Sequence, residues 1–127
     1  EESIVPALKS IFNKESKDYD YIALVQEKIS FLKEYRIIIV DRKIELIYEK
    51  NVFVEINADG LKSRLQEFIN PMFKLVNLQY GGLDIAELVD GSFILFELNT
   101  APRYAPFINK NGNKKIVEIY TKIIKSL

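Results

Sequence analysis

Apolar residues recur along this chain with two different periods, and the period separates the expected helices from the expected strands. Segments 3–12, 61–72 and 116–127 repeat apolar residues every three or four positions, which predicts amphipathic helices. Shorter apolar or alternating segments predict strands at 21–27, 35–40, 43–49, 52–56, 83–88 and 93–98. Because the helices are separated from the strand hairpins along the chain, the pattern predicts an α+β fold. We expect an antiparallel sheet of hairpins with helices packed on one face.

Turn-forming residues indicate how these elements are connected. Asp41-Arg42 lies between two expected strands and predicts a hairpin there. Asn70-Pro71 interrupts a helical pattern, and we expect the helix to kink or restart at this point, because asparagine caps helices and proline suits their first turn. The stretch 100–113 is rich in proline, asparagine and glycine, so we expect a loop.

The composition excludes several kinds of chemistry. The chain has 127 residues, of which 48% are apolar and 28% charged, which is typical of one globular domain. Its 18 basic residues balance its 18 acidic residues, so no net charge attracts nucleic acid or an anionic membrane. It has neither cysteine nor histidine, which excludes disulfides, thiolate metal sites and imidazole catalysis. The first residues do not form a signal peptide, and we expect a cytoplasmic protein.

The most informative segment is the hairpin expected around Asp90-Gly91. A two-residue loop there places Asp84 directly opposite Glu97 and Gly82 opposite Asn99. Because side chains alternate between the two faces of a strand, Asp84, Glu97 and Asn99 then share one face. Nearer the loop, the same register places Phe93 on this face and Ile94 on the other.

Two opposed carboxylates repel each other, so we expect a cation between them. Two carboxylates and an amide oxygen are the hard donors that Mg²⁺ or Mn²⁺ prefers. The alternative is an ordinary hairpin whose acids pair with lysine or arginine. The hairpin pattern alone fits both interpretations.

The segment 81–99 resembles the metal-binding hairpin of the ATP-grasp superfamily. In that family an aspartate, a glutamate about a dozen residues later and an asparagine two residues further bind the ions of Mg-ATP. Asp84, Glu97 and Asn99 match these positions and are followed by Thr100-Ala101-Pro102. Arg103 stands where the family often has glycine. The resemblance implies that Asp84, Glu97 and Asn99 bind Mg²⁺ (or Mn²⁺).

The segment 24–29 resembles the hinge between the two ATP-grasp subdomains. The resemblance implies that this hinge binds the adenine of ATP, through Gln26, Glu27, Lys28 and Ile29. It further implies that Glu34 holds the ribose hydroxyls, while Arg36 approaches the phosphates. Arg103 is a candidate for substrate contact, so both arginines are candidate catalytic residues. A solvated lysine or arginine is an equally good interpretation for Lys28 and Arg36.

The resemblance implies a carboxylate–amine (or carboxylate–thiol) ligase that acts through an acyl phosphate. The chain begins without methionine and has no glycine before Tyr21 that could form the family's phosphate loop. We therefore expect the C-terminal portion of an ATP-grasp domain: 1–28 would be the end of the upstream subdomain and the hinge, and 29–127 the metal-binding subdomain. The isolated chain would then be inactive without the missing upstream half.

The expected partners are ATP and a small-molecule or peptide carboxylate, without nucleic acid or membrane. An apolar face left uncovered by the missing half would favour a homo-oligomer. One alternative is a non-catalytic ATP-grasp-like module that binds or regulates a partner. Another is an unrelated α+β domain whose acids are only ion-paired.

Overall fold

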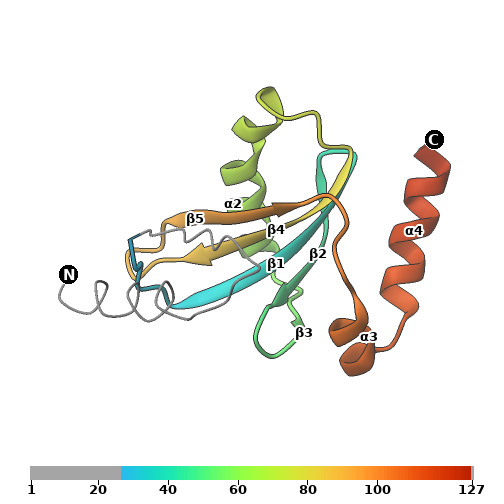
Figure 1. The fold of residues 1–127 in the computed structure, drawn as a ribbon, viewed down its shortest axis with the longest axis horizontal. Helices are drawn as coiled ribbons and strands as arrows, with labels where there is room; N and C mark the ends of the chain where they lie inside the picture. Colours follow the sequence, from blue (N-terminus) through green and yellow to red (C-terminus); the bar gives the residue numbers. More distant parts are fainter. Residues whose placement is uncertain (1–26, 127) are drawn as a thin grey trace, which may run out of the picture.

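The computed structural model describes residues 27–126, which form a five-stranded antiparallel sheet with helices on both of its faces (Figure 1). The strands are β1 (Lys33–Val40), β2 (Lys43–Glu49), β3 (Val54–Glu55), β4 (Tyr80–Glu87) and β5 (Phe93–Asn99). The helical elements are α2 (Asp59–Ile69), the 3-10 helix η1 (Asn70–Lys74), α3 (Ala105–Asn111) and α4 (Lys114–Ser126). The helix expected at 3–12 and nearly all of the strand expected at 21–27 lie outside the described residues.

The strand order is β3-β2-β1-β4-β5, so β1 lies at the centre of the sheet. Its side chains alternate: Ile37 and Ile39 point to one face, while Ile38 and Val40 point to the other. Both faces are covered at this point, which explains why the run is continuously apolar. The predicted β1–β2 hairpin is confirmed, and its two loop residues have the positive φ angles (49° and 65°) of a tight turn.

Two apolar clusters, one on each face, hold the helices to the sheet. The cluster on the α2 face contains Tyr35, Ile37, Ile39, Ile44, Ile47, Leu65, Ile69, Leu78, Leu83 and Ile85. The cluster on the α3 and α4 face contains Ile38, Val40, Leu46, Tyr48, Tyr104, Phe107, Ile116 and Ile119. The α+β class and the antiparallel sheet are confirmed. The helices cover both faces rather than the expected single face, because the second face also carries apolar side chains at one end.

The helix α4 lies beside β1, and α3 lies beside β3, both at the same side of the molecule in Figure 1. The polar positions of β1 and β4, among them Glu34, Arg36 and Asp84, lie further along this second face. The second face is therefore apolar under α3 and α4 and charged beyond them.

The β4–β5 hairpin keeps the predicted pairing at its far end but not at its loop. The loop has three residues (89–91) instead of two: the Leu88 amide donates to the Ser92 carbonyl, and Gly91 has a φ of 82°. The Asp90 carboxylate accepts the Ser92 amide (2.9 Å), which stabilises this longer turn.

A register shift next to Asp84 compensates for the longer loop. Beyond the shift, Asp84 pairs with Glu97 and Gly82 pairs with Asn99, as predicted. Between the shift and the loop the expected faces are wrong, since Phe93 packs against the cluster under α2.

The helical segments differ from prediction at one place. The predicted break at Asn70-Pro71 is confirmed, because α2 passes there into η1. The expected loop 100–113 contains α3, which the sequence pattern missed. Pro106 lies in the first turn of α3, where a missing amide costs no hydrogen bond, and Gly112 ends the helix with a φ of 78°. The strand expected at 52–56 is shorter in the structure, where β3 spans only Val54–Glu55. No helix within 27–126 is long and apolar enough to cross a membrane.

Candidate nucleotide and metal site

Three charged side chains lie in one row across the middle of the sheet. Arg36 on β1 pairs with Asp84 on β4, and Asp84 pairs with Glu97 on β5. Asp84 is 1% exposed and is the only charged side chain buried within the described part of the chain. Glu97 is exposed. A charge so deeply buried requires oppositely charged partners.

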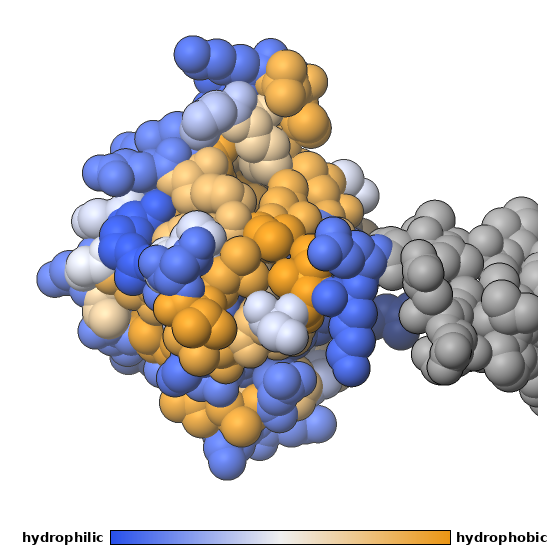
Figure 2. All heavy atoms as spheres, turned by 90° about the vertical axis from the view of Figure 1, so that its left-hand side faces the viewer, coloured by the Kyte–Doolittle hydropathy of each residue, from blue (hydrophilic) through white to orange (hydrophobic). Residues whose placement is uncertain are grey.

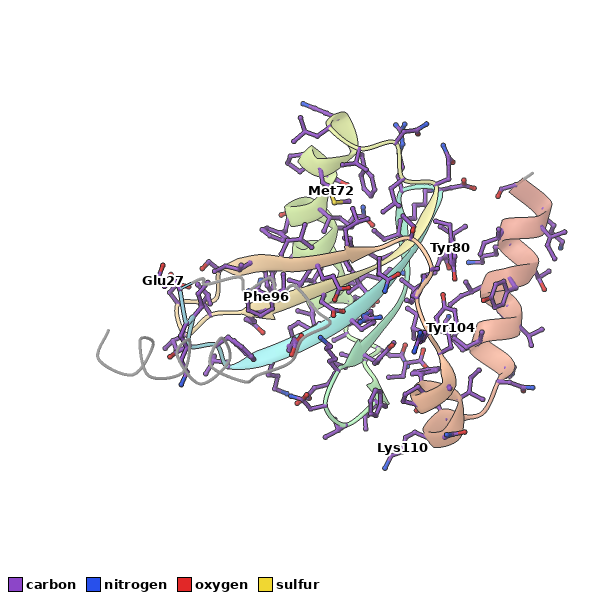
Figure 3. The ribbon with its side chains drawn as sticks, in the orientation of Figure 1. Glu27, Met72, Tyr80, Phe96, Tyr104 and Lys110 are labelled. Atoms are coloured by element: carbon purple, nitrogen blue, oxygen red, sulfur yellow. The ribbon has the colours of Figure 1, made fainter. Side chains whose placement is uncertain are left out.

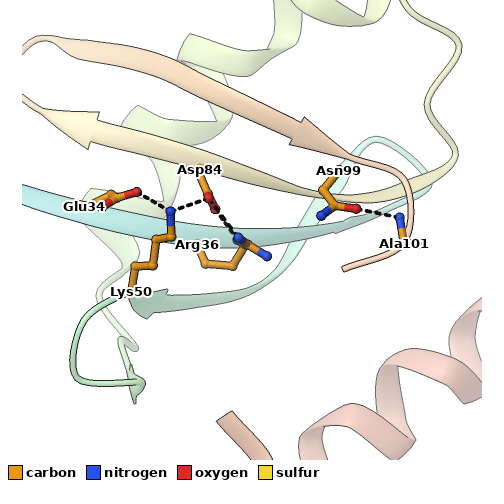
Figure 4. A network of polar contacts seen from close by, with 6 residues as sticks. All are labelled: Glu34, Arg36, Lys50, Asp84, Asn99 and Ala101. Carbon is orange, nitrogen blue, oxygen red and sulfur yellow. Dashed lines mark hydrogen bonds and ion pairs between the residues drawn. The ribbon is translucent and has the colours of Figure 1, made fainter. Parts of the chain in front are cut away.

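Arg36 and Lys50 are those partners (Figure 4). Arg36 holds both carboxylate oxygens of Asp84, donating from Nε to Oδ1 and from Nη2 to Oδ2 (2.8 Å). The Lys50 ammonium lies 2.7 Å from Oδ2 of Asp84 and 2.6 Å from Oε1 of Glu34. Lys50 therefore bridges two acids that come from different strands.

These contacts determine the charge state of the network. Burial alone would raise the pKa of Asp84, but the hydrogen bonds and positive charges of Arg36 and Lys50 outweigh burial and lower it. Burial would likewise lower the pKa of Arg36 and of Lys50, yet the bonds to Asp84, and for Lys50 also to Glu34, raise both. These shifts keep Asp84, Arg36 and Lys50 ionised at neutral pH.

The third predicted metal ligand, Asn99, follows Glu97 by two residues on β5 and is half-buried. Its Oδ1 accepts the amide of Ala101 (2.9 Å), which fixes the side chain at the turn after the strand. Within residues 27–126, no group of three or more acidic, histidine or cysteine side chains is arranged to hold a metal ion. Two carboxylates and one amide oxygen fit Mg²⁺ in kind, because this ion completes its shell with water and phosphate oxygens.

The ion-pair alternative thus describes the contacts of Asp84 in the chain by itself. The metal assignment concerns the chain with Mg-ATP, and Asp84, Glu97 and Asn99 as ligands remain a prediction.

A groove rich in positive charge opens beside this row. Its lining consists of Arg36, Tyr48, Lys50, Asn51, Phe53, Arg103, Ala105 and Pro106. The two predicted catalytic arginines, Arg36 and Arg103, are therefore brought to one groove from β1 and from the segment before α3. Three of its lining residues are cationic and none is anionic, although Arg36 and Lys50 also pair with Asp84 and Glu34 outside the lining.

No protein-family profile and no curated protein matches the chain, whereas solved structures do. The ATP-grasp ligase PsnB complexed with minimal precursor matches with a TM-score of 0.58 and 18% identity, over 79% of this chain and 35% of that one. A Chryseobacterium gregarium RiPP-associated ATP-grasp ligase, in complex with ADP and a leader and core peptide, matches with a TM-score of 0.56 and 17% identity, over 77% and 33%. PsnB complexed with a precursor peptide and AMPPNP gives 0.51 and 22%, over 76% and 33%.

The fold is that of part of an ATP-grasp ligase. The resemblance inferred from the sequence is confirmed at the level of the fold. The chain spans about a third of the length of the ligases that it matches.

The predicted ATP-grasp hinge lies at the opposite end of the sheet from α3 and α4. Gln26 is outside the described residues, whereas Glu27 and Lys28 are exposed and Ile29 is half-buried. Glu27 and Ile29 line a shallow groove together with Ile94, Leu95 and Phe96 of β5. Figure 3 shows Glu27 and Phe96 at this same end of the sheet. The adenine assignment stays a prediction.

This end of the molecule carries an apolar surface (Figure 2). Its exposed large apolar side chains include Phe31, Leu32, Val89, Leu95 and Phe96. The rings of Phe31 and Phe96 meet edge to face at 5.6 Å. Apolar and aromatic side chains usually form the walls of ligand pockets.

The predicted ribose ligand Glu34 faces the charged row, where one of its oxygens contacts Lys50. Lys50 itself was missed by the sequence analysis. Its signal was weak, because it directly follows the last residue of β2 and looks like an ordinary turn lysine. Only the pairing of β1 with both β2 and β4 brings it to Asp84.

Proposed function

We propose that this chain is the Mg-ATP-binding part of an ATP-dependent ligase that joins a carboxylate to an amine or a thiol. The observation that carries the proposal is the row Arg36–Asp84–Glu97 beside a cation-lined groove, on a sheet with an ATP-grasp fold. We assign residues 1–28 to the end of the upstream subdomain and the hinge, and 29–127 to the metal-binding subdomain. Glu27–Ile29 and the apolar wall of β5 would hold adenine, and the second oxygen of Glu34 a ribose hydroxyl.

The proposed reaction begins when the acceptor carboxylate attacks the γ-phosphorus of ATP, which gives an acyl phosphate and releases ADP. The amine or thiol then attacks the acyl carbon and releases phosphate. Bound Mg²⁺ would neutralise charge on the transferring phosphoryl group. Asp84, Glu97 and Asn99 would hold this ion. Arg36 and Arg103 would hold the phosphoryl and carboxylate oxygens in the groove, since a guanidinium recognises both groups through paired hydrogen bonds.

The solved ligases whose structures resemble this chain include complexes with leader, core or precursor peptides. This supports a peptide carboxylate as the acceptor, in preference to a small molecule. We further propose that the protein acts in the cytoplasm, where Mg-ATP is available, with an upstream ATP-grasp half as its partner.

The test is the melting temperature of the chain with Mn²⁺ and AMPPNP, compared among the parent, Glu97→Gln and Glu118→Gln. Glu97 is exposed, so its replacement leaves the fold intact. Glu118 on α4 pairs only with Lys115 among the described contacts and controls for the loss of one carboxylate. We expect the ligands to raise the melting temperature of the parent and of Glu118→Gln by roughly 5–10 °C at saturation, and that of Glu97→Gln by much less. Equal ligand shifts in all three proteins, or none in any, would contradict the proposal.

A second candidate is a non-catalytic ATP-grasp-like module. It is favoured by one observation: both oxygens of Asp84 are already bound by cations of the chain itself. Such a module would show no Mn²⁺-dependent stabilisation. The same melting experiment therefore separates the two candidates.

A further inference from the structure

Lys50 contacts a carboxylate that a metal ion would bind in the proposed site. Its ammonium lies 2.7 Å from Asp84, a proposed metal ligand, and 2.6 Å from Glu34. An ammonium among carboxylate oxygens satisfies the same negative charge that a divalent cation would satisfy. Lys50 and a metal ion therefore compete for the same oxygen atom of Asp84.

Of the two cations that hold Asp84, Lys50 is the one free to leave. Arg36 lies directly across the ladder from Asp84, binds both of its oxygens and has a side chain that is only 13% exposed. The Lys50 side chain is 35% exposed and touches one oxygen of Asp84. The Lys50 amide donates to the Glu34 carbonyl (2.9 Å), so the backbone is anchored while the flexible side chain can turn.

The position to which Lys50 would turn is also present. Lys50 lines the groove that Arg103 and Asn51 line, so its side chain stands on the border between the acidic row and the cationic groove. A rotation about the side-chain bonds of Lys50 therefore moves its ammonium from the acidic row into the groove.

The charges of the row favour this exchange. Glu34, Asp84 and Glu97 supply three negative charges, and Arg36 and Lys50 supply two positive ones. A divalent ion added beside Lys50 would leave an excess of positive charge. A divalent ion that replaces Lys50 gives a neutral set of three carboxylates, one guanidinium and one metal ion. Coulomb energy in a partly buried site selects the neutral set.

We propose that Lys50 is a built-in substitute for the metal ion, which neutralises Asp84 in the metal-free chain and moves into the neighbouring groove when a divalent ion binds. The inference rests on the proposed function, since it takes Asp84 and Glu97 as metal ligands. It adds a coupling: metal binding delivers a positive charge to the groove, and an anion in the groove draws Lys50 away from Asp84 and so strengthens metal binding. The two effects are equal in size, because binding free energies are reciprocal.

The first experiment measures the affinity of the full chain for Mn²⁺ by the loss of the free-ion signal in electron paramagnetic resonance. Lys50→Met removes the competitor and should bind Mn²⁺ roughly tenfold more tightly than the parent. Lys50→Arg keeps the charge and should bind like the parent. Lys33→Met removes a neighbouring lysine that pairs with Glu49 (3.3 Å), and it should change the affinity by less than about twofold. Equal or weaker binding by Lys50→Met overturns the proposal.

The second experiment observes the displacement in the native chain and uses a variant only to assign the signal. A lysine ammonium held by two carboxylates exchanges its protons slowly enough to give a ¹H–¹⁵N signal in ¹⁵N-lysine-labelled protein at low temperature and mildly acidic pH. The signal of Lys50 is identified by its absence in Lys50→Arg. Saturating Mg²⁺ should abolish or shift it while the signals of other lysines stay. An unchanged Lys50 signal at saturation overturns the proposal.

These outcomes separate the inference from the proposed function. Binding of Mn²⁺ by the parent without any gain in Lys50→Met refutes the role of Lys50 alone. Absence of Mn²⁺ binding in every protein refutes both the role of Lys50 and the metal site on which it rests. Tighter binding by Lys50→Met together with loss of the Lys50 signal supports both.

Discussion

Replacing Asp84 by asparagine removes the negative charge that Arg36 and Lys50 share at the middle of the sheet. Breaking a fully buried ion pair by removing one partner costs about 3–5 kcal/mol, because the remaining charge stays buried and unpaired. The side chains of Arg36 and Lys50 are 13% and 35% exposed, so both regain part of their hydration. We therefore expect Asp84→Asn to lose roughly 2–3 kcal/mol of unfolding free energy at pH 7.

The assay is urea unfolding of the metal-free chain, followed by far-ultraviolet circular dichroism. A loss of this size should lower the midpoint by roughly 1–2 M without a change in slope. Glu97→Gln is the matched control: it removes the opposed carboxylate, but Glu97 is exposed, and we expect a change within about 0.5 kcal/mol. If Asp84→Asn were as stable as the parent or more stable, repulsion between the two acids would dominate and our interpretation of the ion pairs would be wrong.

The same comparison has a defined pH dependence. The folded-state pKa of Asp84 is depressed below the ordinary value of 3.8, so its ion pairs contribute stability that is fully present above this value. The contribution is lost as the pH falls through the depressed pKa. The difference in unfolding free energy between parent and Asp84→Asn should therefore be constant from pH 7 to about pH 5. It should shrink only in more acidic solution.

Two further predictions concern the loops beside the row. In Gly82→Ala a new Cβ would lie 2.9 Å from Cβ of Pro102, so the segment after β5 must shift, and we expect the unfolding free energy to fall by about 1–3 kcal/mol. In the control variant Gly60→Ala on α2, the new Cβ meets nothing within 4 Å, and we expect a neutral or stabilising effect. Equal unfolding free energies for the two alanine variants would contradict this. Arg64 on α2 donates to the Gly91 carbonyl (2.5 Å) and to Glu87 (3.1 Å) and stacks on Phe93, so Arg64→Met should speed amide exchange in the β4–β5 loop at least severalfold while Lys62→Met should not.

The pairing of Asp84 with Glu97 could be predicted although the loop that joins their strands was assigned wrongly. A loop of three residues moves every later residue of β5 by one position and would put Glu97 on the other face. The irregularity beside Asp84 moves the strand back, so the error cancels at the far end of the hairpin. The predicted faces were wrong only for residues of β5 between the loop and the irregularity, such as Phe93. Alternation along a strand predicts faces reliably only up to the first bulge.

The helix α3 was missed for a different reason. Residues 105–113 are dense in proline, asparagine and glycine, which are typical of loops when position is ignored. Here Pro106 and Gly112 stand at the two ends of a short helix, where each is favourable. What reveals the helix is the burial of Phe107 against Tyr48, with ring centroids 4.9 Å apart, and such a tertiary contact has no local pattern.

The cation that holds Asp84 could be anticipated in kind but not in identity. The opposed acids required a positive charge, and both a metal ion and a basic side chain met that requirement. Arg36 was predicted to approach the phosphates, yet its contact with Asp84 depends on β1 lying beside β4, which is a property of the sheet order and not of either strand. The contact of Lys50 with Asp84 depends on two strand pairings at once, and the two residues lie 34 positions apart along the chain.

The presence of both cations changes what the acidic row requires of the rest of the protein. If a metal ion were the only positive charge available, the row would be repulsive until Mg-ATP bound, and this part of the sheet would be unstable alone. With Arg36 and Lys50 in contact, every buried polar side-chain atom of the described chain has a hydrogen-bond partner before any ligand arrives. The same contacts lower the affinity for a metal ion, because an arriving ion must first displace the Lys50 ammonium. A nucleotide that brings its own phosphate charge relieves that cost by giving Lys50 and Arg36 new anionic partners. On this reasoning Mn²⁺ alone should bind weakly, and AMPPNP should strengthen its binding more in the parent than in Lys50→Met.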